Sequence, residues 1–233
     1  MDEYEEEIKV IFPHASGAGA TSIIEVLIGL PFKEGRSMTT SSESFVNYFV
    51  EINNKKYCLN LWEIISQKAC RPLTKIFLKN SKIVIFVYDI TSRSSFEDLN
   101  NWIKDVKEIL GNNYICGLIG TKSDLFLKKE VREEEAESFA KSQGMKLRFV
   151  SAKNPIPIRK FIDELCYDYL CKFVDDKLIM KKYNKKDKKE KKKKEIKEIK
   201  AKKENINIDE RKILQLHKLN INYIKTISKY NNY

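Results

Sequence analysis

The segment from Lys9 to Ser22 constrains the fold more than any other part of the chain. It joins a short apolar run to a glycine-containing turn and then to a helix that opens on Thr21. This is the layout of a phosphate-binding loop, whose pattern is G-x-x-x-x-G-K-[ST]. The corresponding residues read H-A-S-G-A-G-A-T, so His14 stands at the first glycine and Ala20 at the lysine. Because backbone N–H groups at a helix N-terminus attract phosphate whatever the side chains are, the segment predicts a phosphate site without its usual cation.

The substitutions in this loop predict weaker phosphate binding rather than none. A hydrogen bond to a charged group contributes about 1.5–3 kcal/mol, so the absence of lysine at Ala20 should lower affinity about 10- to 150-fold. Gly17 and Gly19 keep the turn sterically possible. Pro13 fixes φ and removes one N–H. His14 would crowd the loop entry if it faced the phosphates. The simplest expectation is a solvent-facing loop residue, and a substitute cation for the missing lysine is the alternative.

Apolar runs and helical periods alternate along the next 150 residues. Strands are expected at residues 8–12, 45–53, 57–62, 83–88, 114–119 and 147–150, and the second and third form a hairpin. Helices are expected at 21–30, 95–110, 131–143 and 158–174. This order predicts an α/β fold with a six-stranded, mostly parallel sheet and helices on both faces. The glycine loop and residues 62–63, 121–124 and 151–153 all follow strands, so they should meet at one edge of the sheet.

Charge is distributed unevenly. The net charge is +11, and residues 181–204 contribute most of it with fourteen lysines against five acids. The remainder is close to neutral, so a nucleic-acid-binding globule is not indicated. The lysines are also not interleaved with an aromatic platform, and nucleic acid is not an expected partner.

The sequence favours a cytoplasmic protein. It has no apolar run of the ~20 residues that a membrane span needs. We expect no signal peptide, myristoyl site or prenylation box. The five cysteines have no metal-binding spacing and are expected to be free thiols in a reducing compartment.

Further motifs occur at consistent spacing after the hairpin. They are Val87-Tyr88-Asp89-Ile90-Thr91, the segment from Ser95 to Trp102, Gly120-Thr121-Lys122-Ser123-Asp124-Leu125, the segment from Glu134 to Ala140, and Ser151-Ala152-Lys153. With these motifs, residues 7–173 closely resemble the Ras-superfamily small GTPases, and within them the Rab branch. The resemblance implies the Ras-like P-loop NTPase fold. It also implies a regulatory switch that binds GTP or GDP with Mg²⁺, acts in vesicle or membrane trafficking and engages protein effectors.

The resemblance implies an intact site for the guanine base. Asp124 would accept hydrogen bonds from the base N1–H and exocyclic amine, and Lys122 would lie over the ring. Thr121 stands where Rabs usually have Asn. Phe32 has the spacing of the aromatic residue that packs on the base. The implied nucleotide contacts are Ser16, Gly17, Ala18, Gly19, Ala20, Thr21, Ser22, Phe32, Thr121, Lys122, Asp124, Ser151, Ala152 and Lys153.

The implied metal site is altered. Thr21 would supply a hydroxyl to Mg²⁺, and Glu63 replaces the aspartate of the family's D-x-x-G, from which it could reach the metal through water. The switch threonine is either Thr39 or Thr40, since counts from the two flanking motifs differ by one residue.

The hydrolysis machinery is also mixed. Gln67 matches the water-positioning glutamine, but Ser66 replaces the glycine of a flexible hinge. We expect reduced affinity for nucleotide and Mg²⁺, with weak or absent hydrolysis. The alternative is a nucleotide-free pseudoGTPase that acts as a scaffold or assembly subunit.

Four segments are expected in the chain. Residues 1–6 form an acidic arm, 7–174 the Ras-like domain, 175–204 a lysine-rich charged helix or linker, and 205–233 an amphipathic helix. The last has apolar residues three and four apart, namely Leu216, Leu219, Tyr223, Ile227 and Tyr230. It could pack on a partner helix, residues 181–204 could contact an anionic membrane surface, or the whole extension could be solvated without a specific role.

Overall fold

The fold is built on one six-stranded sheet. The computed structural model describes residues 3–35, 45–65 and 76–174. The sheet has the strand order β2-β3-β1-β4-β5-β6. Its strands are β1 (Glu7–His14), β2 (Phe45–Ile52), β3 (Lys55–Ile65), β4 (Ile83–Asp89), β5 (Ile115–Thr121) and β6 (Lys146–Phe149). The β2–β3 pair is antiparallel and the other four pairs are parallel, which confirms the predicted Ras-like sheet.

Sequence patterns explain the centre and the edge of this sheet. All seven residues of β4 are buried, as expected for an apolar strand covered on both faces. Exposed residues recur along the edge strand β2, which joins β3 through Asn53 and Asn54. These two asparagines have φ of 53° and 63°, the left-handed values that a two-residue hairpin turn requires.

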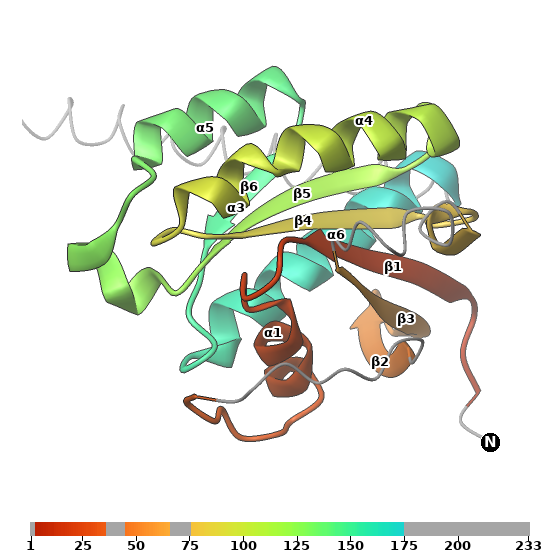
Figure 1. Ribbon diagram of the computed structural model, residues 1–233. Helices are drawn as coiled ribbons and strands as arrows, with labels where there is room; N and C mark the ends of the chain where they lie inside the picture. Colours follow the sequence, from red (N-terminus) through yellow and green to blue (C-terminus); the bar gives the residue numbers. More distant parts are fainter. Residues whose placement is uncertain (1–2, 36–44, 66–75, 175–233) are drawn as a thin grey trace, which may run out of the picture. The chain divides into compact units, whose positions relative to one another are not determined.

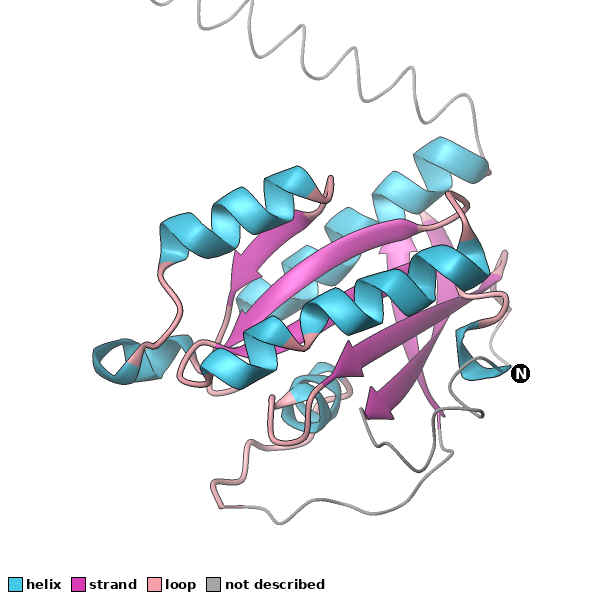
Figure 2. Cartoon of the chain, turned by 45° about the horizontal axis from the view of Figure 1, so that its top comes forward, coloured by secondary structure: helices cyan, strands magenta, loops and turns pink. Residues whose placement is uncertain are grey.

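Helices cover both faces of the sheet. Helices α1 (Ala20–Leu27) and α6 (Pro155–Phe173) lie on one face, and α3 (Arg93–Glu97), α4 (Leu99–Leu110) and α5 (Glu133–Ser142) lie on the other (Figure 1). The same two layers are visible in the turned view of Figure 2. The region expected as one helix at 95–110 contains two helices. The first begins after the N-cap Ser92, and the two are separated at Asp98. The Ser92 side chain accepts from the Ser95 N–H.

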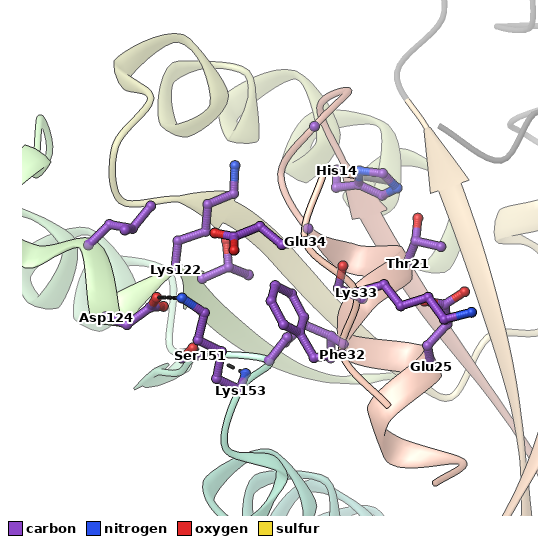
Figure 3. A pocket seen from close by; sticks show the side chains of 18 of the residues that line it. His14, Thr21, Glu25, Phe32, Lys33, Glu34, Lys122, Asp124, Ser151 and Lys153 are labelled. Carbon is purple, nitrogen blue, oxygen red and sulfur yellow. Dashed lines mark hydrogen bonds and ion pairs between the residues drawn. The ribbon is translucent and has the colours of Figure 1, made fainter. Parts of the chain in front are cut away.

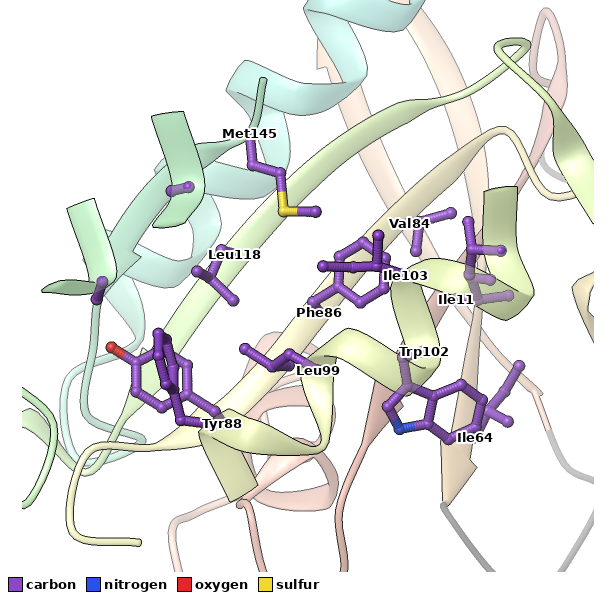
Figure 4. Close-up of a cluster of buried hydrophobic side chains, with 14 of the residues drawn as sticks. Ile11, Ile64, Val84, Phe86, Tyr88, Leu99, Trp102, Ile103, Leu118 and Met145 are labelled. Atoms are coloured by element: carbon purple, nitrogen blue, oxygen red, sulfur yellow. The ribbon is translucent and has the colours of Figure 1, made fainter. Parts of the chain in front are cut away.

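The core has one part on each face. Under α3 and α4, fully buried Phe86 and Leu118 pack with Trp102 and their neighbours (Figure 4). On the opposite face, a Cβ at Gly117 would lie 2.8 Å from Leu165 and 2.9 Å from the Phe161 ring. The missing side chain therefore lets α6 pack directly on β5, the strand that leads into the segment Gly120–Leu125.

The first strand is longer than expected. It continues through Pro13 to His14, whose partners are Ile65 on β3 and Val87 on β4. Pro13 has no N–H to donate to a neighbouring strand. Along β4, the pair Ile11–Val84 is followed directly by the pair His14–Val87. His14 is consequently a strand residue with 2% exposure, and the expectation of a solvent-facing loop residue was wrong.

Candidate nucleotide-binding site

A cavity of ≈ 320 Å³ lies at the carboxyl edge of the parallel strands, which is where α/β sheets bind ligands (Figure 3). Its volume is at the lower end of the range for small-molecule pockets. The lining residues include His14, Gly17, Gly19, Thr21, Ser22, Phe32, Glu63, Thr121, Lys122, Asp124, Ser151, Ala152 and Lys153. Segments more than 100 residues apart in the chain therefore meet as the sequence predicts.

The glycine loop leads into helix α1 without a capping side chain. Gly17 and Gly19 have φ of 79° and 88°, a conformation that residues with a Cβ rarely adopt. Gly19 is the N-cap of α1, and the first turn contains no acidic residue. The positive end of the helix thus favours an anion, and the Glu63 carboxylate already accepts from the Thr21 N–H there.

Thr121 fastens this loop to the sheet. Its hydroxyl is 2.6 Å from the Ala18 carbonyl oxygen and 3.1 Å from that of Tyr88, and the residue is 2% exposed. The hydroxyl has one proton, which the shorter distance assigns to Ala18. The threonine found where Rabs usually have asparagine therefore has a structural role in holding the loop.

Replacing Thr121 by Val should destabilise the domain. The change keeps the shape but leaves the buried Ala18 carbonyl without its donor, which costs about 1–3 kcal/mol in the free energy of unfolding. Urea unfolding without added nucleotide measures this effect. Thr121→Ser keeps the hydroxyl and should lose about 1 kcal/mol or less, from one missing methyl group. Equal losses in the two variants would contradict the role of the hydroxyl.

The base end of the cavity is organised around Asp124. Its Oδ2 lies 2.9 Å from Lys153 Nζ. Burial acts to raise the pKa of Asp124, but hydrogen bonds from Lys153 and Ser151 outweigh it and hold the pKa below the usual value. Phe32 lies across the cavity, with its ring centroid 5.8 Å from Lys153 Nζ (Figure 3). Asp124 is thus an ionised acceptor that faces an aromatic ring across the cavity, which suits a flat base that carries N–H donors.

Lys122 is anchored rather than loose. It has φ of 57°, and its Nζ lies 2.6 Å from Asp89 Oδ2. Asp89 is buried and also accepts hydrogen bonds from the Thr91 N–H and hydroxyl. This anchor fixes the Lys122 stem at the cavity wall, where the resemblance implies that it covers the base.

The phosphate end contains a cluster of three side chains, His14, Thr21 and Glu63. Thr21 Oγ1 donates to Glu63 Oε1 at 2.5 Å, and His14 Nε2 lies 3.0 Å from the same oxygen. His14 Nδ1 lies 2.7 Å from the Ala15 carbonyl oxygen. Burial acts to raise the pKa of Glu63, but hydrogen bonds from His14 and Thr21 lower it overall. Glu63 is therefore held as a carboxylate at the start of α1.

Two of the expected magnesium ligands, Thr21 and Glu63, lie together in this cluster. Thr21 donates its hydroxyl proton to Glu63 Oε1 and keeps two lone pairs on its oxygen, the type of ligand that Mg²⁺ prefers. Thr39 and Thr40 lie outside the described residues.

The structure places the remaining expected contacts differently. Ser16 is exposed on the loop but does not line the cavity. Ala18 and Ala20 are fully buried, and the Ala18 carbonyl faces Thr121 instead of the cavity. Gln67 and Ser66 fall outside the described part of the chain. The contact of His14 with Glu63 was missed, because it depends on the pairing of β1 with β3, which brings these two strand ends together.

The fold and cavity define an α/β protein of the P-loop class. A model of the Ras family matches residues 9–171. Ras-related protein Rab-30 of Homo sapiens is 30% identical over 167 residues, which is 71% of this chain and 82% of that protein. Ras-related protein Rab-21 of Homo sapiens is 34% identical over 164 residues, 70% of either chain. The chain therefore belongs to the Ras family and is Rab-like.

Proteins of the Ras family bind GTP or GDP, generally with Mg²⁺, and act through protein effectors. Within the described residues, no helix combines the length and apolar character needed to cross a membrane.

Proposed function

We propose that this chain is a Rab-like regulator that binds GTP or GDP in the cavity, with weak or absent GTP hydrolysis. The observation that carries the proposal is the ionised Asp124 opposite Phe32, supported by Ser151 and Lys153. A carboxylate has about four lone-pair sites, so Asp124 can keep its contact with Lys153 and still accept two base hydrogens. Ala20 supports weak hydrolysis, because it supplies no charge to the transferred phosphate.

The proposal extends to partners and location. Similarity to Rab proteins supports a role in vesicle or membrane trafficking, with the protein in the cytoplasm or at a membrane surface. The basic segment 181–204 would supply contact with anionic lipid, and the segment 205–233 a partner helix; both lie outside the described residues. An exposed aromatic stack on the hairpin offers a surface to protein partners. Phe45 is 45% exposed and stacks on Trp62 at 4.9 Å, and Phe77 lies beside Trp62 at 5.9 Å.

The direct test is to measure which nucleotide the purified chain carries and binds. We expect bound GDP or GTP on extraction, and competition of fluorescent GDP by GDP and GTP but not by ATP. The reduced phosphate contacts predict an affinity about 10- to 150-fold below that of a loop with lysine. A chain that is purified empty and binds none of these nucleotides, with or without Mg²⁺, would contradict the proposal.

A second candidate function is a nucleotide-free scaffold. One observation favours it: Glu63 accepts hydrogen bonds from both the side chain and the backbone of Thr21, at the helix end where a phosphate would sit. In that case the aromatic stack would bind the same partners with equal affinity whether or not guanine nucleotide is present. A partner affinity that depends on nucleotide would exclude this function.

A further inference from the structure

Two apolar side chains lie on the surface of the short 3₁₀ helix η2 (Ser123–Lys128), which follows β5. Phe126 is 63% exposed and Leu127 is 87% exposed, the two highest values among the large apolar residues of the described chain. Neither side chain lines the cavity or belongs to the core. The helix, light green in Figure 1, projects beyond the end of the sheet. These two residues therefore form an apolar tip that nothing in the domain covers.

The backbone on both sides of the apolar tip is held in place. The Ser123 N–H donates to the Val150 carbonyl oxygen at 3.1 Å, and the Leu125 N–H donates to that of Lys122 at 2.8 Å. After the helix, Lys129 Nζ lies 2.7 Å from Glu133 Oε1 on α5. The apolar tip is thus presented by a fixed backbone, which lowers the entropy lost when it binds to a surface.

The size and the neighbours of the apolar tip indicate what kind of surface covers it. A stable protein partner usually buries roughly 800 Å² on each side, and two side chains supply only a small part of that area. The next three residues, Lys128, Lys129 and Glu130, are exposed and charged, so the apolar surface does not extend in that direction. Phe and Leu beside Lys suit the interface of a bilayer, where apolar side chains enter the acyl boundary and ammonium groups stay among the headgroups.

The lysine-rich segment 181–204 adds the charge that selects an anionic bilayer. It has fourteen lysines against five acids, whereas two of the three acids in the first turn of α5 are paired, Glu133 with Lys129 and Glu135 with Arg93. Helix α6 has 19 residues and is roughly 28 Å long. Residues 175–204 span roughly 45 Å as a helix and roughly 100 Å when extended, so the lysines can reach the bilayer that the apolar tip contacts.

We propose that Phe126 and Leu127 insert into the surface of an anionic bilayer, as a second membrane contact in addition to the one proposed for the segment 181–204. One weak anchor gives only marginal, reversible attachment, and stable attachment takes two signals. The apolar tip supplies one and the lysines supply the other. Because Asp124 lies on the same short helix, the base end of the cavity is then held close to the bilayer. The inference goes beyond nucleotide binding and does not depend on it.

The test measures partition of the full chain into phosphatidylcholine vesicles with and without phosphatidylserine. The natural chain should bind the mixed vesicles more tightly, because the lysines attract anionic lipid. Complete burial of one Phe or Leu side chain raises a partition constant about 10-fold or more, so Phe126→Ala with Leu127→Ala, which lie only partly in the acyl region, should weaken binding about 30-fold. The matched control, Phe49→Ala with Leu30→Ala, removes the same residue types at positions 39% and 49% exposed and should bind like the natural chain.

Fluorescence shows directly whether the apolar tip enters the lipid. In Phe126→Trp, the emission above that of the two natural tryptophans should shift to the blue on mixed vesicles, whereas Phe49→Trp should not respond. No shift at position 126, or equal binding by the natural chain and the double variant at the tip, would overturn the inference. A natural chain that binds neither kind of vesicle would overturn both membrane contacts and leave the nucleotide proposal standing. If it instead forms a dimer that the double variant at the tip does not form, the tip contacts a second copy and not a bilayer.

Discussion

Replacing Asp124 by Asn should weaken GDP binding by about 150-fold or more, because two hydrogen bonds to a charged acceptor contribute about 1.5–3 kcal/mol each. Asp124 is the ionised acceptor at the base end, and its Oδ2 is held 2.9 Å from Lys153 Nζ. The amide that replaces it has one acceptor atom and would turn an N–H donor toward a base that also donates. Titration with fluorescent GDP measures the loss.

The chemistry of the base supplies a sharper readout than affinity alone. Xanthine carries a carbonyl oxygen where guanine carries the exocyclic amine, so it can accept from the new amide. Xanthosine diphosphate should therefore bind Asp124→Asn better than GDP does, which reverses the preference of the natural chain. Asp105→Asn removes a carboxylate on α4 that does not line the cavity and should change neither affinity. An unchanged preference in the Asp124 variant would contradict the assignment of the base end.

The parts of the fold that sequence predicted best are those with continuous apolar runs. Residues 83–88 were expected as a strand covered on both faces, and β4 extends only one residue further. The hairpin was expected from alternating strands at 45–53 and 57–62; it is present with a shorter turn, Asn53 and Asn54, because β3 already begins at Lys55. In both cases the burial seen in the folded domain agrees with the local sequence pattern, so the pattern alone predicts the element.

The sequence was less informative where a single residue has competing preferences. Pro13 lacks a donor and predicts the end of a strand, yet β1 continues past it because His14 still pairs with its neighbours on both sides. That continuation decides whether His14 faces solvent or the cavity. The expected helix 95–110 likewise begins earlier and breaks at Asp98, which caps one helix and begins the next.

The candidate site was predicted in outline but not in its contacts. Motif spacing places Asp124, Lys122 and Thr21 around one cavity, and the structure brings them together. Spacing carries no information on pairs such as Thr21 with Glu63, 42 residues apart, or Thr121 with Ala18, 103 residues apart. Such contacts depend on how strand ends meet in the folded sheet, and the sequence alone does not specify them.

Replacing Leu118 by Ala should reduce the free energy of unfolding by about 2–5 kcal/mol, which is the usual cost of truncating a buried leucine and leaving a cavity. Leu118 is fully buried on β5, where it lies beside Phe86 on β4 and Leu147 on β6. It belongs to the cluster under α3 and α4 (Figure 4). Urea unfolding in EDTA without nucleotide measures the change, so that ligand binding does not add to the apparent stability.

Leu127→Ala is the matched control, because it removes the same atoms from a side chain that is 87% exposed, and it should change stability by no more than about 0.5 kcal/mol. The comparison is specific to one face of the sheet. Neighbouring residues of a strand point to opposite faces, so Leu118 packs on the α4 side while Gly117 admits α6 on the other. Similar losses in the two leucine variants would show that β5 is not buried as described. The position of the base-end loop, which follows β5 directly, would then lose its support.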